Sequence, residues 1–141
     1  MREPEHFIVV DDNRTSNLIC EFAIRKYYKD VTINLYTEPE MALQNIGEEY
    51  NRKQNDTLTI LFLDINMPSM TGWEFLEAFR SFGEKVHRQF IIYILTSSVD
   101  DRDKEKAASD PLVAGFFSKP LTAVGVQQAV DGADDHPAHW R

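Results

Sequence analysis

The chain has 141 residues, of which 43% are hydrophobic and 27% charged, a composition typical of one globular domain with a sizeable core. Its formal net charge of -8 repels phosphate backbones and anionic lipid, so we expect no direct binding to nucleic acid or to membranes. Cys20 is the single cysteine, which excludes an internal disulfide, and no secretory signal or membrane-spanning run is recognisable, so we expect a cytoplasmic protein.

Five short apolar runs rich in Ile, Val, Phe and Tyr predict five β-strands. In chain order they are HFIVV at 6–10, VTINLY at 31–36, LTILFL at 58–63, FIIYIL at 90–95 and VAGFF at 113–117. Segments of helical length separate these runs. Strands that alternate with helices are typical of βαβ units and a parallel sheet, which is an α/β fold.

Apolar spacing predicts the buried side of the first and third intervening helices. Over residues 14–28 the predicted core side carries Leu18, Ile19, Phe22 and Ala23, and over residues 72–82 it carries Phe75, Leu76, Phe79 and Phe82. Cys20 lies toward the apolar side of the first helix and is predicted to be a core residue rather than a reactive thiol.

Two later helices have weaker patterns. The predicted helix at 98–110 has only Val99, Ala107 and Ala108 as apolar residues, so little buried surface anchors it. The apolar residues of the last helix exceed one narrow core stripe, and they are Leu121, Val124, Val126 and Val130. We therefore expect these two helices to be weakly anchored, so that their exposed surface can change its conformation.

The second run differs from the others because Val31, Ile33 and Leu35 alternate with polar Thr32 and Asn34. Alternation is typical of a half-exposed strand, whereas the first, third and fourth runs are continuously apolar, as strands covered on both faces should be. A five-stranded doubly wound sheet in the order 2-1-3-4-5 accounts for both patterns, with helices on both faces.

The predicted domain comprises residues 1–130, with a polar loop at 51–57. Residues 131–141 lack periodicity, so we expect a flexible C-terminal tail.

Polar side chains follow four of the five predicted strands, where ligands bind in open α/β sheets. Asp11 and Asp12 follow the first strand, Asp64 the third, Thr96 the fourth, and Lys119 with Pro120 the fifth. Singly, each could be a helix cap, a turn residue or a solvated loop residue. Three carboxylates in one place repel one another unless a cation neutralises them, and two carboxylates with water are typical of Mg²⁺. Metal, carboxylate, ammonium and hydroxyl together are typical of a phosphoryl-transfer site.

The segments VVDDN, LDINMPSMTGWEFL, ILTSS and FFSKPL, in this order and spacing, resemble the CheY-like receiver domain of two-component response regulators. The resemblance covers about residues 6–130 and implies a flavodoxin-like fold. It also implies that a sensor histidine kinase or a phosphotransfer protein supplies a phosphoryl group to Asp64. Mg²⁺ would be bound by the side chains of Asp12 and Asp64, by the backbone carbonyl of Asn66 and, mainly through water, by Asp11.

The same resemblance assigns the remaining site residues. Lys119 would pair with the acceptor and then with the phosphoryl group, Thr96 would donate to a phosphoryl oxygen, and Ser97 would leave the donor's approach open. Phe116 takes the aromatic switch position, where tyrosine is commoner, so a hydroxyl is lost while the ring can still repack. The Lys119–Pro120 bond is usually cis in this family.

This resemblance predicts a stand-alone phosphorylation switch, not an enzyme beyond its own phosphorylation and dephosphorylation. Its output would pass to an unknown downstream protein or to a second copy through the predicted helix at 98–110, the strand at 113–117 and the last helix. One alternative is a Mg²⁺-dependent aspartyl-phosphate phosphatase, but such enzymes place an acid two residues after the nucleophile, where this chain has Asn66. A degenerate receiver acting as a scaffold is the other, and the intact acids, Thr96 and Lys119 argue against it.

Overall fold

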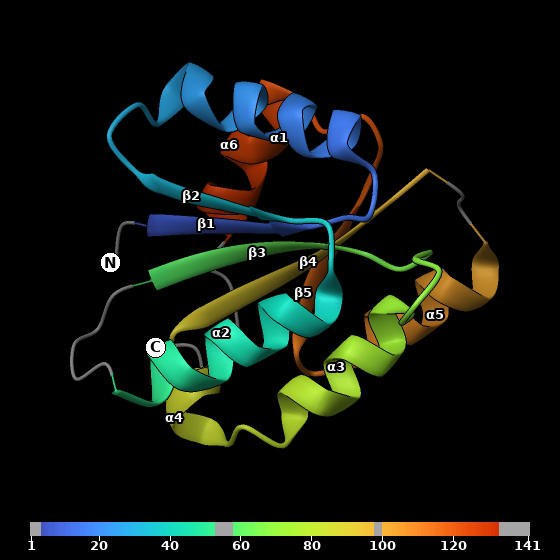
Figure 1. The fold of residues 1–141 in the computed structure, drawn as a ribbon. Helices are drawn as coiled ribbons and strands as arrows, with labels where there is room; N and C mark the ends of the chain where they lie inside the picture. Colours follow the sequence, from blue (N-terminus) through green and yellow to red (C-terminus); the bar gives the residue numbers. More distant parts are fainter. Residues whose placement is uncertain (1–3, 53–57, 98–99, 133–141) are drawn as a thin grey trace.

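The computed structural model describes residues 4–52, 58–97 and 100–132, which form one parallel sheet between two layers of helices (Figure 1). In chain order the elements are β1 (Pro4–Val10), α1 (Arg14–Tyr27), β2 (Thr32–Tyr36), α2 (Pro39–Arg52), β3 (Leu58–Asp64), α3 (Gly72–Arg80), α4 (Glu84–His87), β4 (Phe90–Thr96), α5 (Asp101–Ser109), β5 (Val113–Ser118) and α6 (Ala123–Gly132). The strand order is β2-β1-β3-β4-β5, so the predicted fold class is confirmed. No helix in the described ranges is both long and apolar enough to cross a membrane.

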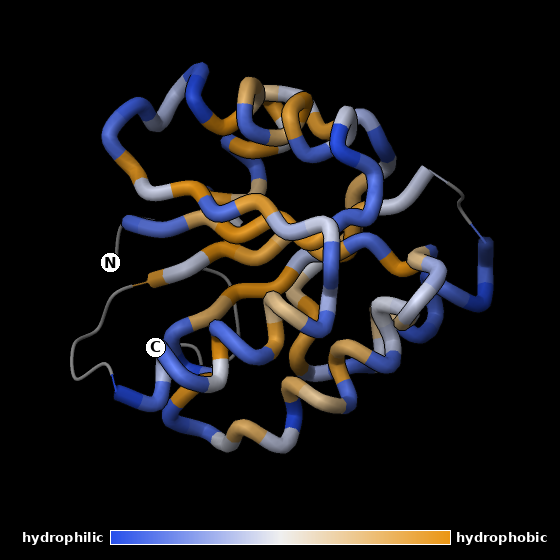
Figure 2. The backbone as a smooth tube through the Cα atoms, viewed as in Figure 1, coloured by the Kyte–Doolittle hydropathy of each residue, from blue (hydrophilic) through white to orange (hydrophobic). Residues whose placement is uncertain are grey.

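The core lies on the central strands of the sheet. β3 and β4 are buried at every position, because α1 and α6 cover one face of the sheet and α2, α3, α4 and α5 cover the other (Figure 1). Figure 2 shows the hydrophobic residues concentrated along these strands. β2 alternates exposed and half-buried residues, which confirms its predicted place at an edge, and β5 is half-buried at the opposite edge.

Side-chain caps fix where the helices after β1, β3 and β4 begin. Asn13 accepts a hydrogen bond from the first turn of α1, and Asp100 does the same for α5. Thr71 and Glu74 form a reciprocal capping box at the start of α3. These caps define the loops at the carboxyl ends of the strands, where the predicted site residues lie.

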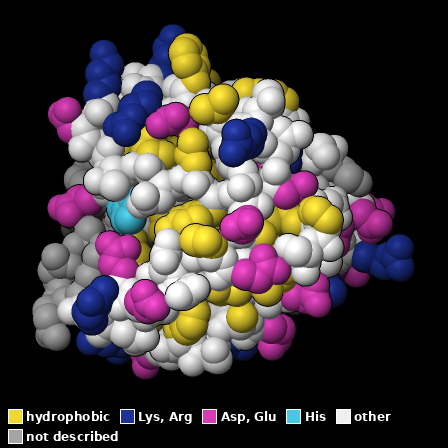
Figure 3. Space-filling view, in the orientation of Figure 1, with side chains coloured by type: hydrophobic (Ala, Val, Ile, Leu, Met, Phe, Trp, Pro, Cys, Tyr) yellow, Lys and Arg dark blue, Asp and Glu magenta, His cyan; other side chains and the backbone are white. Residues whose placement is uncertain are grey.

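The buried side of α1 is not the predicted one, although Ala23 and Cys20 are buried as expected. Asn17, Cys20, Ala23 and Ile24 face the core, whereas Leu18, Ile19 and Phe22 are 60, 42 and 78% exposed. The small side chains of Cys20 and Ala23 let the helix approach the sheet closely, and hydrogen bonds to the backbone make the burial of Asn17 tolerable. Hydrophobic side chains are consequently exposed over α1 (Figure 3).

The other helical predictions are corrected in detail. Phe75, Leu76 and Phe79 of α3 are buried as predicted, and Phe82 is half-buried just beyond the helix. In α5 only Ala107 is buried, since Ala108 is exposed and Val99 lies outside the described residues. Leu121, Val126 and Val130 are buried, whereas Val124 is 61% exposed.

One helix and two boundaries also differ from the prediction. α4 was not predicted, because it has four residues and buries only Val86. α2 continues through Arg52 into the predicted polar loop, whose residues 53–57 lie outside the described part of the chain. α6 ends at Gly132, two residues beyond the predicted domain limit of 130, and the predicted tail from residue 133 on lies outside the described residues.

Candidate functional site

Three acidic side chains meet at the carboxyl ends of β1 and β3. Asp11 and Asp12 follow β1 directly, and Asp64 is the last residue of β3, its neighbour in the sheet. One carboxylate oxygen from each lies within 4.8 Å of the others. Asp11 and Asp64 are 0 and 3% exposed, whereas Asp12 is exposed, so the cluster has two buried acids and one acid open to solvent.

Lys119 brings the compensating charge from the end of β5. Its Nζ lies 2.6 Å from Asp11 Oδ2 and 3.4 Å from Asp64 Oδ2. Its backbone N–H donates to the Thr96 carbonyl at 2.8 Å, which ties the ends of β4 and β5 together, and the Lys119–Pro120 peptide bond is cis. The sequence-predicted acids and ammonium therefore form one contiguous group.

The electrostatics of the cluster follow from burial and from its excess of negative charge. Burial raises the pKa of Asp64, the charge of Asp11 raises it further, and Lys119 with the Asn66 N–H lowers it only in part. Burial lowers the pKa of Lys119, but the hydrogen bond and charge of Asp11 outweigh this effect, so the pKa of Lys119 is raised and the ammonium is retained.

The donor set fits a hard divalent cation. The cluster has three carboxylates, and Lys119 pairs with two of them, Asp11 and Asp64, so these four side chains keep a net negative charge whenever the acids are ionised. All the candidate ligands are oxygens, and the exposed Asp12 leaves the group open to solvent on one side. Mg²⁺ prefers such oxygen ligands and usually keeps several waters.

The loop after β3 is shaped by Gly72 at the start of α3. The Gly72 N–H donates to the Ile65 carbonyl at 3.0 Å, and a Cβ on residue 72 would lie 2.8 Å from the carbonyl oxygen of Asp64 and from the Cα of Ile65. Only glycine permits this approach. The Asn66 N–H donates to Asp64 Oδ1 at 3.3 Å, so the backbone of the same loop orients the acid.

The family model described as the response regulator receiver domain matches residues 7–131. The chain belongs to this family. The match covers most of the chain and includes Asp11, Asp12, Asp64, Lys119, β2 to β5 and β1 from Phe7 on. The family prediction made from the four sequence segments is therefore confirmed.

Similar proteins occur in fungi and bacteria. Stress response regulator protein 1 of Debaryomyces hansenii is 31% identical over 120 residues, which are 84% of this chain and 45% of that protein, so the chain matches less than half of that relative. A two-component response regulator of Cytophaga hutchinsonii is 28% identical with a TM-score of 0.81, covering 92% of this chain and 96% of that one. The Saccharomyces cerevisiae receiver domain of Ssk1, co-crystallised with the histidine phosphotransfer protein Ypd1, shares the fold with a TM-score of 0.72 at 20% identity, over 100% of this chain and 99% of that chain.

The other predicted site residues of this receiver domain differ in their burial and in the part of the surface that they line. Thr96 is fully buried at the end of β4, and Ser97 after it is exposed. Asn66 is exposed beside Asp64. Phe116 is half-buried on β5 and lines a hollow against α5 rather than the acid cluster. The structure thus brings Asp11, Asp12, Asp64 and Lys119 together, and it places Phe116 on the face next to α5.

A hollow of about 380 Å³ opens beside Lys119 between α1 and the loops after β4 and β5. It is lined by Asn13, Ser16, Ile19, Cys20, Leu95, Ser97, Lys119, Pro120 and Leu121. Burial raises the pKa of the Cys20 thiol to about 12, and the charge of Asp11 adds to the effect, so this thiol stays protonated. The receiver domain therefore has a partly apolar depression next to the ammonium of its acid cluster.

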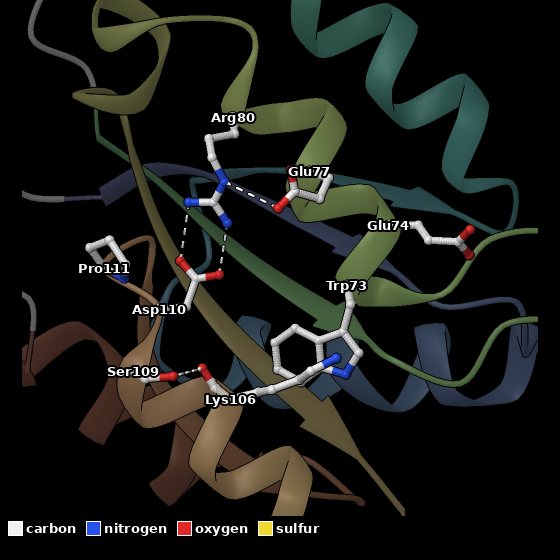
Figure 4. Close-up of a pocket in the computed structure, with 8 residues that line it drawn as sticks. All are labelled: Trp73, Glu74, Glu77, Arg80, Lys106, Ser109, Asp110 and Pro111. Atoms are coloured by element: carbon white, nitrogen blue, oxygen red, sulfur yellow. Dashed lines mark hydrogen bonds and ion pairs between the residues drawn. The ribbon is translucent and has the colours of Figure 1, made fainter.

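A second hollow, of about 460 Å³, lies between α3 and α5 (Figure 4), and none of Asp11, Asp12 and Asp64 lines it. Across it the Trp73 Nε1–H donates to Asp103 at 3.1 Å, and Arg80 pairs with Asp110 through contacts of 2.9 and 3.4 Å. Lys106 lies over the Trp73 ring at 5.3 Å from its centroid. These contacts join α5 to the helix that follows the Asp64 loop.

Sequence reasoning missed Asn17 and Trp73. Asn17 was missed because a polar residue on a predicted helix is expected to be exposed. Its burial close to the acids is the signal that reveals it, and this burial is seen only in the structure. Trp73 contacts Asp103, thirty residues away, and no local pattern in the sequence announces that pairing.

Proposed function

We propose that this receiver domain is a phosphorylation switch in which Asp64 accepts a phosphoryl group from a phosphohistidine of a sensor histidine kinase or phosphotransfer protein. The observation that carries the proposal is the position of Asp64, at the end of a fully buried strand, beside two further acids and 3.4 Å from the Lys119 ammonium. The rigid strand supplies a fixed nucleophile, and phosphoryl transfer depends mainly on positioning and charge neutralisation.

Each step of the transfer assigns a task to this chain's residues. A carboxylate oxygen of Asp64 attacks phosphorus while the bond from phosphorus to the donor's imidazole nitrogen breaks, and the imidazole keeps the electron pair. Asp12, Asp64, the Asn66 carbonyl and, through water, Asp11 would hold Mg²⁺, which supplies charge neutralisation at the phosphoryl oxygens. Lys119 would contact one phosphoryl oxygen.

On the other side of the phosphoryl group, Thr96 would donate a hydrogen bond to a second oxygen. Ser97 is exposed beside Lys119 in the same hollow, and its small side chain leaves the approach to Asp64 open. Hydrolysis of the aspartyl phosphate by water, which releases inorganic phosphate and restores the Asp64 carboxylate, would end the signal, so we propose a switch and not an enzyme acting on other substrates. The cytoplasmic location expected from the sequence is part of this proposal.

The exposed apolar side chains of α1 support a protein phosphodonor as partner. Leu18, Ile19 and Phe22 are exposed on this helix, and Ile19 also lines the hollow beside Lys119. A donor that buried these side chains would bring its phosphohistidine to the edge of the acid cluster. The Ssk1 receiver domain, which shares this fold, was co-crystallised with a histidine phosphotransfer protein, and we propose that a protein of that kind binds here.

The output surface we propose is the face formed by α5, β5 and α6. α5 buries only Ala107, so few contacts hold it to the sheet. Phe116 lies half-buried in the hollow between α5 and β5, where its ring can repack when Thr96 moves toward the phosphoryl group. A downstream protein or a second copy of the chain would bind the altered face.

Intact-mass measurement tests the function. Incubation with acetyl phosphate and Mg²⁺ is expected to add one phosphoryl group to the wild-type chain and none to Asp64→Ala. Label on Asp64→Ala would contradict the acceptor assignment, and label on the wild type in EDTA would contradict the role of Asp12. A phosphatase would instead turn over added phosphomonoesters, which we expect not to occur because Asn66 cannot serve as a general acid.

A further inference from the structure

Asn17 on α1 is a buried side chain that joins the ends of two strands. Its Nδ2 donates to the Asp11 carbonyl at 3.0 Å and to the Tyr36 carbonyl at 3.3 Å, and the residue is 3% exposed. Asp11 follows β1, and Tyr36 is the last residue of β2. One amide group therefore links the two strands at the point where the chain leaves the sheet to form the acid loop.

The orientation of this amide is determined by its neighbours. Both nearby groups are carbonyl oxygens, so only the NH₂ end of the Asn17 amide can face them. Its Oδ1 is buried and has no hydrogen-bond partner among the residues that the structure describes. Leaving an amide oxygen unpaired in the interior costs stability, and leucine would fill the same space without that cost. Packing alone does not account for an asparagine here.

The two hydrogen bonds act on the residue that carries the first acid. The Asp11 N–H also donates to the Tyr36 carbonyl at 3.0 Å, so both polar groups of the Asp11 main chain are fixed. Its carboxylate is held from two sides, since Oδ1 accepts from the Asn13 N–H at 2.9 Å and Oδ2 lies 2.6 Å from Lys119 Nζ. Without Asn17 these contacts of the Asp11 carboxylate would remain, but the Asp11 backbone carbonyl would lose its hydrogen bond from Asn17.

We propose that Asn17 is a positioning residue of the phosphorylation site, and this inference rests on the function proposed above. It holds the loop between β1 and α1 so that Asp11 and the adjacent Asp12 keep one carboxylate oxygen each within 4.8 Å of one from Asp64, where the three acids would hold Mg²⁺. Mg²⁺ demands near-octahedral geometry at short ligand distances, so a loop that wanders by a fraction of an ångström weakens binding. Asn17 acts through Asp11 and does not itself touch the phosphoryl group.

The chain offers a matched control at the opposite end of the sheet. Gln89, just before β4, is 4% exposed, and its Nε2 donates to the carbonyls of Tyr50 and Lys85 at 2.9 and 3.0 Å. Its Oε1 is likewise buried without a hydrogen-bond partner among the described residues. Asn17→Leu and Gln89→Met therefore remove the same kind of amide bridge while keeping side-chain length, one beside the acids and one far from them.

Calorimetric titration of the full chain with MgCl₂ is the deciding measurement. Both variants are expected to unfold at a lower temperature than the wild type, whereas only Asn17→Leu is expected to bind Mg²⁺ more weakly, on the order of tenfold, as is typical for residues that orient metal ligands. The phosphorylation rate of Asn17→Leu with acetyl phosphate should be low at limiting Mg²⁺ and recover at saturating Mg²⁺. Equal Mg²⁺ affinity in Asn17→Leu and Gln89→Met would overturn the proposal.

Two further outcomes are separable. If the wild type binds no Mg²⁺ and accepts no phosphate, the proposed function fails and this inference fails with it; if the wild type does both and Asn17→Leu matches it, only the inference fails. Should Asn17→Leu not fold, the side-chain amide resonances of the wild type decide. Mg²⁺ should shift the Asn17 amide signal and leave that of Gln89 in place, and an unmoved Asn17 signal would overturn the proposal.

Discussion

Lys119 is bound more closely to Asp11 than to Asp64, since its Nζ lies 2.6 Å from Asp11 Oδ2 and 3.4 Å from Asp64 Oδ2. The ammonium thus pairs mainly with an acid other than the proposed acceptor, which would leave the Asp64 carboxylate less encumbered for attack. A phosphoryl group on Asp64 would add negative charge beside Lys119. The ammonium would then shift from Asp11 toward that group, which couples the chemistry to a movement of the loop after β5.

Replacing Lys119 by alanine should leave the fold intact but uncouple phosphorylation from its conformational response. The buried acids lose their countercharge, so we expect a loss of roughly 2 kcal/mol in the free energy of unfolding, less than for a pair that is buried on both sides. Amide spectra with and without acetyl phosphate measure the response, with Lys29→Ala at an exposed site as control. A full phosphorylation-dependent change in Lys119→Ala would make this lysine a bystander.

Asp64→Asn should stabilise the protein at neutral pH. The pKa of Asp64 is raised in the folded state, first by burial and then by Asp11, so the folded chain holds this proton more tightly than the unfolded chain. Stability from this group is therefore present below the unfolded pKa of about 4 and is lost as the pH rises through the raised folded pKa. Urea unfolding should show the variant above the wild type at pH 7 and level with it near the unfolded pKa.

Mg²⁺ provides the check on this second prediction. A cation that neutralises Asp64 should raise the stability of the wild type at pH 7 and raise that of Asp64→Asn less, because the variant has one charged ligand fewer. If Asp64→Asn were less stable than the wild type at pH 7, the ionised Asp64 would stabilise the folded protein, and its pKa could not be raised by burial and by Asp11.

Gly72→Ala should displace the loop between β3 and α3, which follows Asp64. A Cβ at this position would lie 2.8 Å from the Asp64 carbonyl and the Ile65 Cα, which are backbone atoms and cannot swing aside. We expect a destabilisation of about 1–3 kcal/mol, typical of overpacking, and slower phosphorylation at every Mg²⁺ concentration. Gly47→Ala on α2 is the control, because its Cβ meets only the half-buried Phe82 ring, at 3.1 Å. Equal phosphorylation rates in the two variants would contradict the positional role.

The strand ends of this chain were predictable from the sequence and several contacts were not. The apolar runs end within one residue of the ends of β1, β3, β4 and β5, so Asp64 and Lys119 could be placed at the carboxyl ends of the strands from the sequence. The buried face of α1 could not be predicted, because hydrogen bonds to two backbone carbonyls allow the polar Asn17 to be buried. The pattern of polar and apolar residues in the sequence does not record such hydrogen bonds.

Contacts between segments that are distant in the sequence could not be predicted for a different reason. Tyr50 on α2 bonds to His6 on β1 at 2.7 Å and to Thr59 on β3 at 2.8 Å, forming a buried polar group at the other end of the sheet. Each of these residues has an ordinary local explanation in the sequence, and only the packing of α2 on the sheet brings them together. The pairing of Arg80 with Asp110 across α3 and α5 is of the same kind.

Asp110→Asn should loosen α5 in the unphosphorylated protein. Arg80 holds Asp110 through two contacts, and Ala107 is the only buried residue of this helix. Removing the charge while keeping the shape should cost about 1 kcal/mol, since Arg80 is partly exposed, and amides of residues 101–109 should exchange faster with solvent. Glu84→Gln breaks an exposed ion pair with Arg88 and serves as control. Unchanged exchange in Asp110→Asn would show that other contacts hold the helix.

Phosphorylation itself should alter the same helix and the strand beside it. As Thr96 moves toward the phosphoryl group and Phe116 repacks, α5 should shift relative to Trp73, whose indole is bonded to Asp103. Trp73 fluorescence should therefore change on addition of acetyl phosphate and Mg²⁺, and Trp140→Phe removes the other tryptophan from the signal.

Hydrogen exchange over 100–132 should change in parallel, whereas 4–10 in β1 should keep its protection because that strand is buried and paired on both sides. Protection over 100–132 that is the same before and after phosphorylation, with a silent Trp73, would mean that the signal leaves the domain by another face.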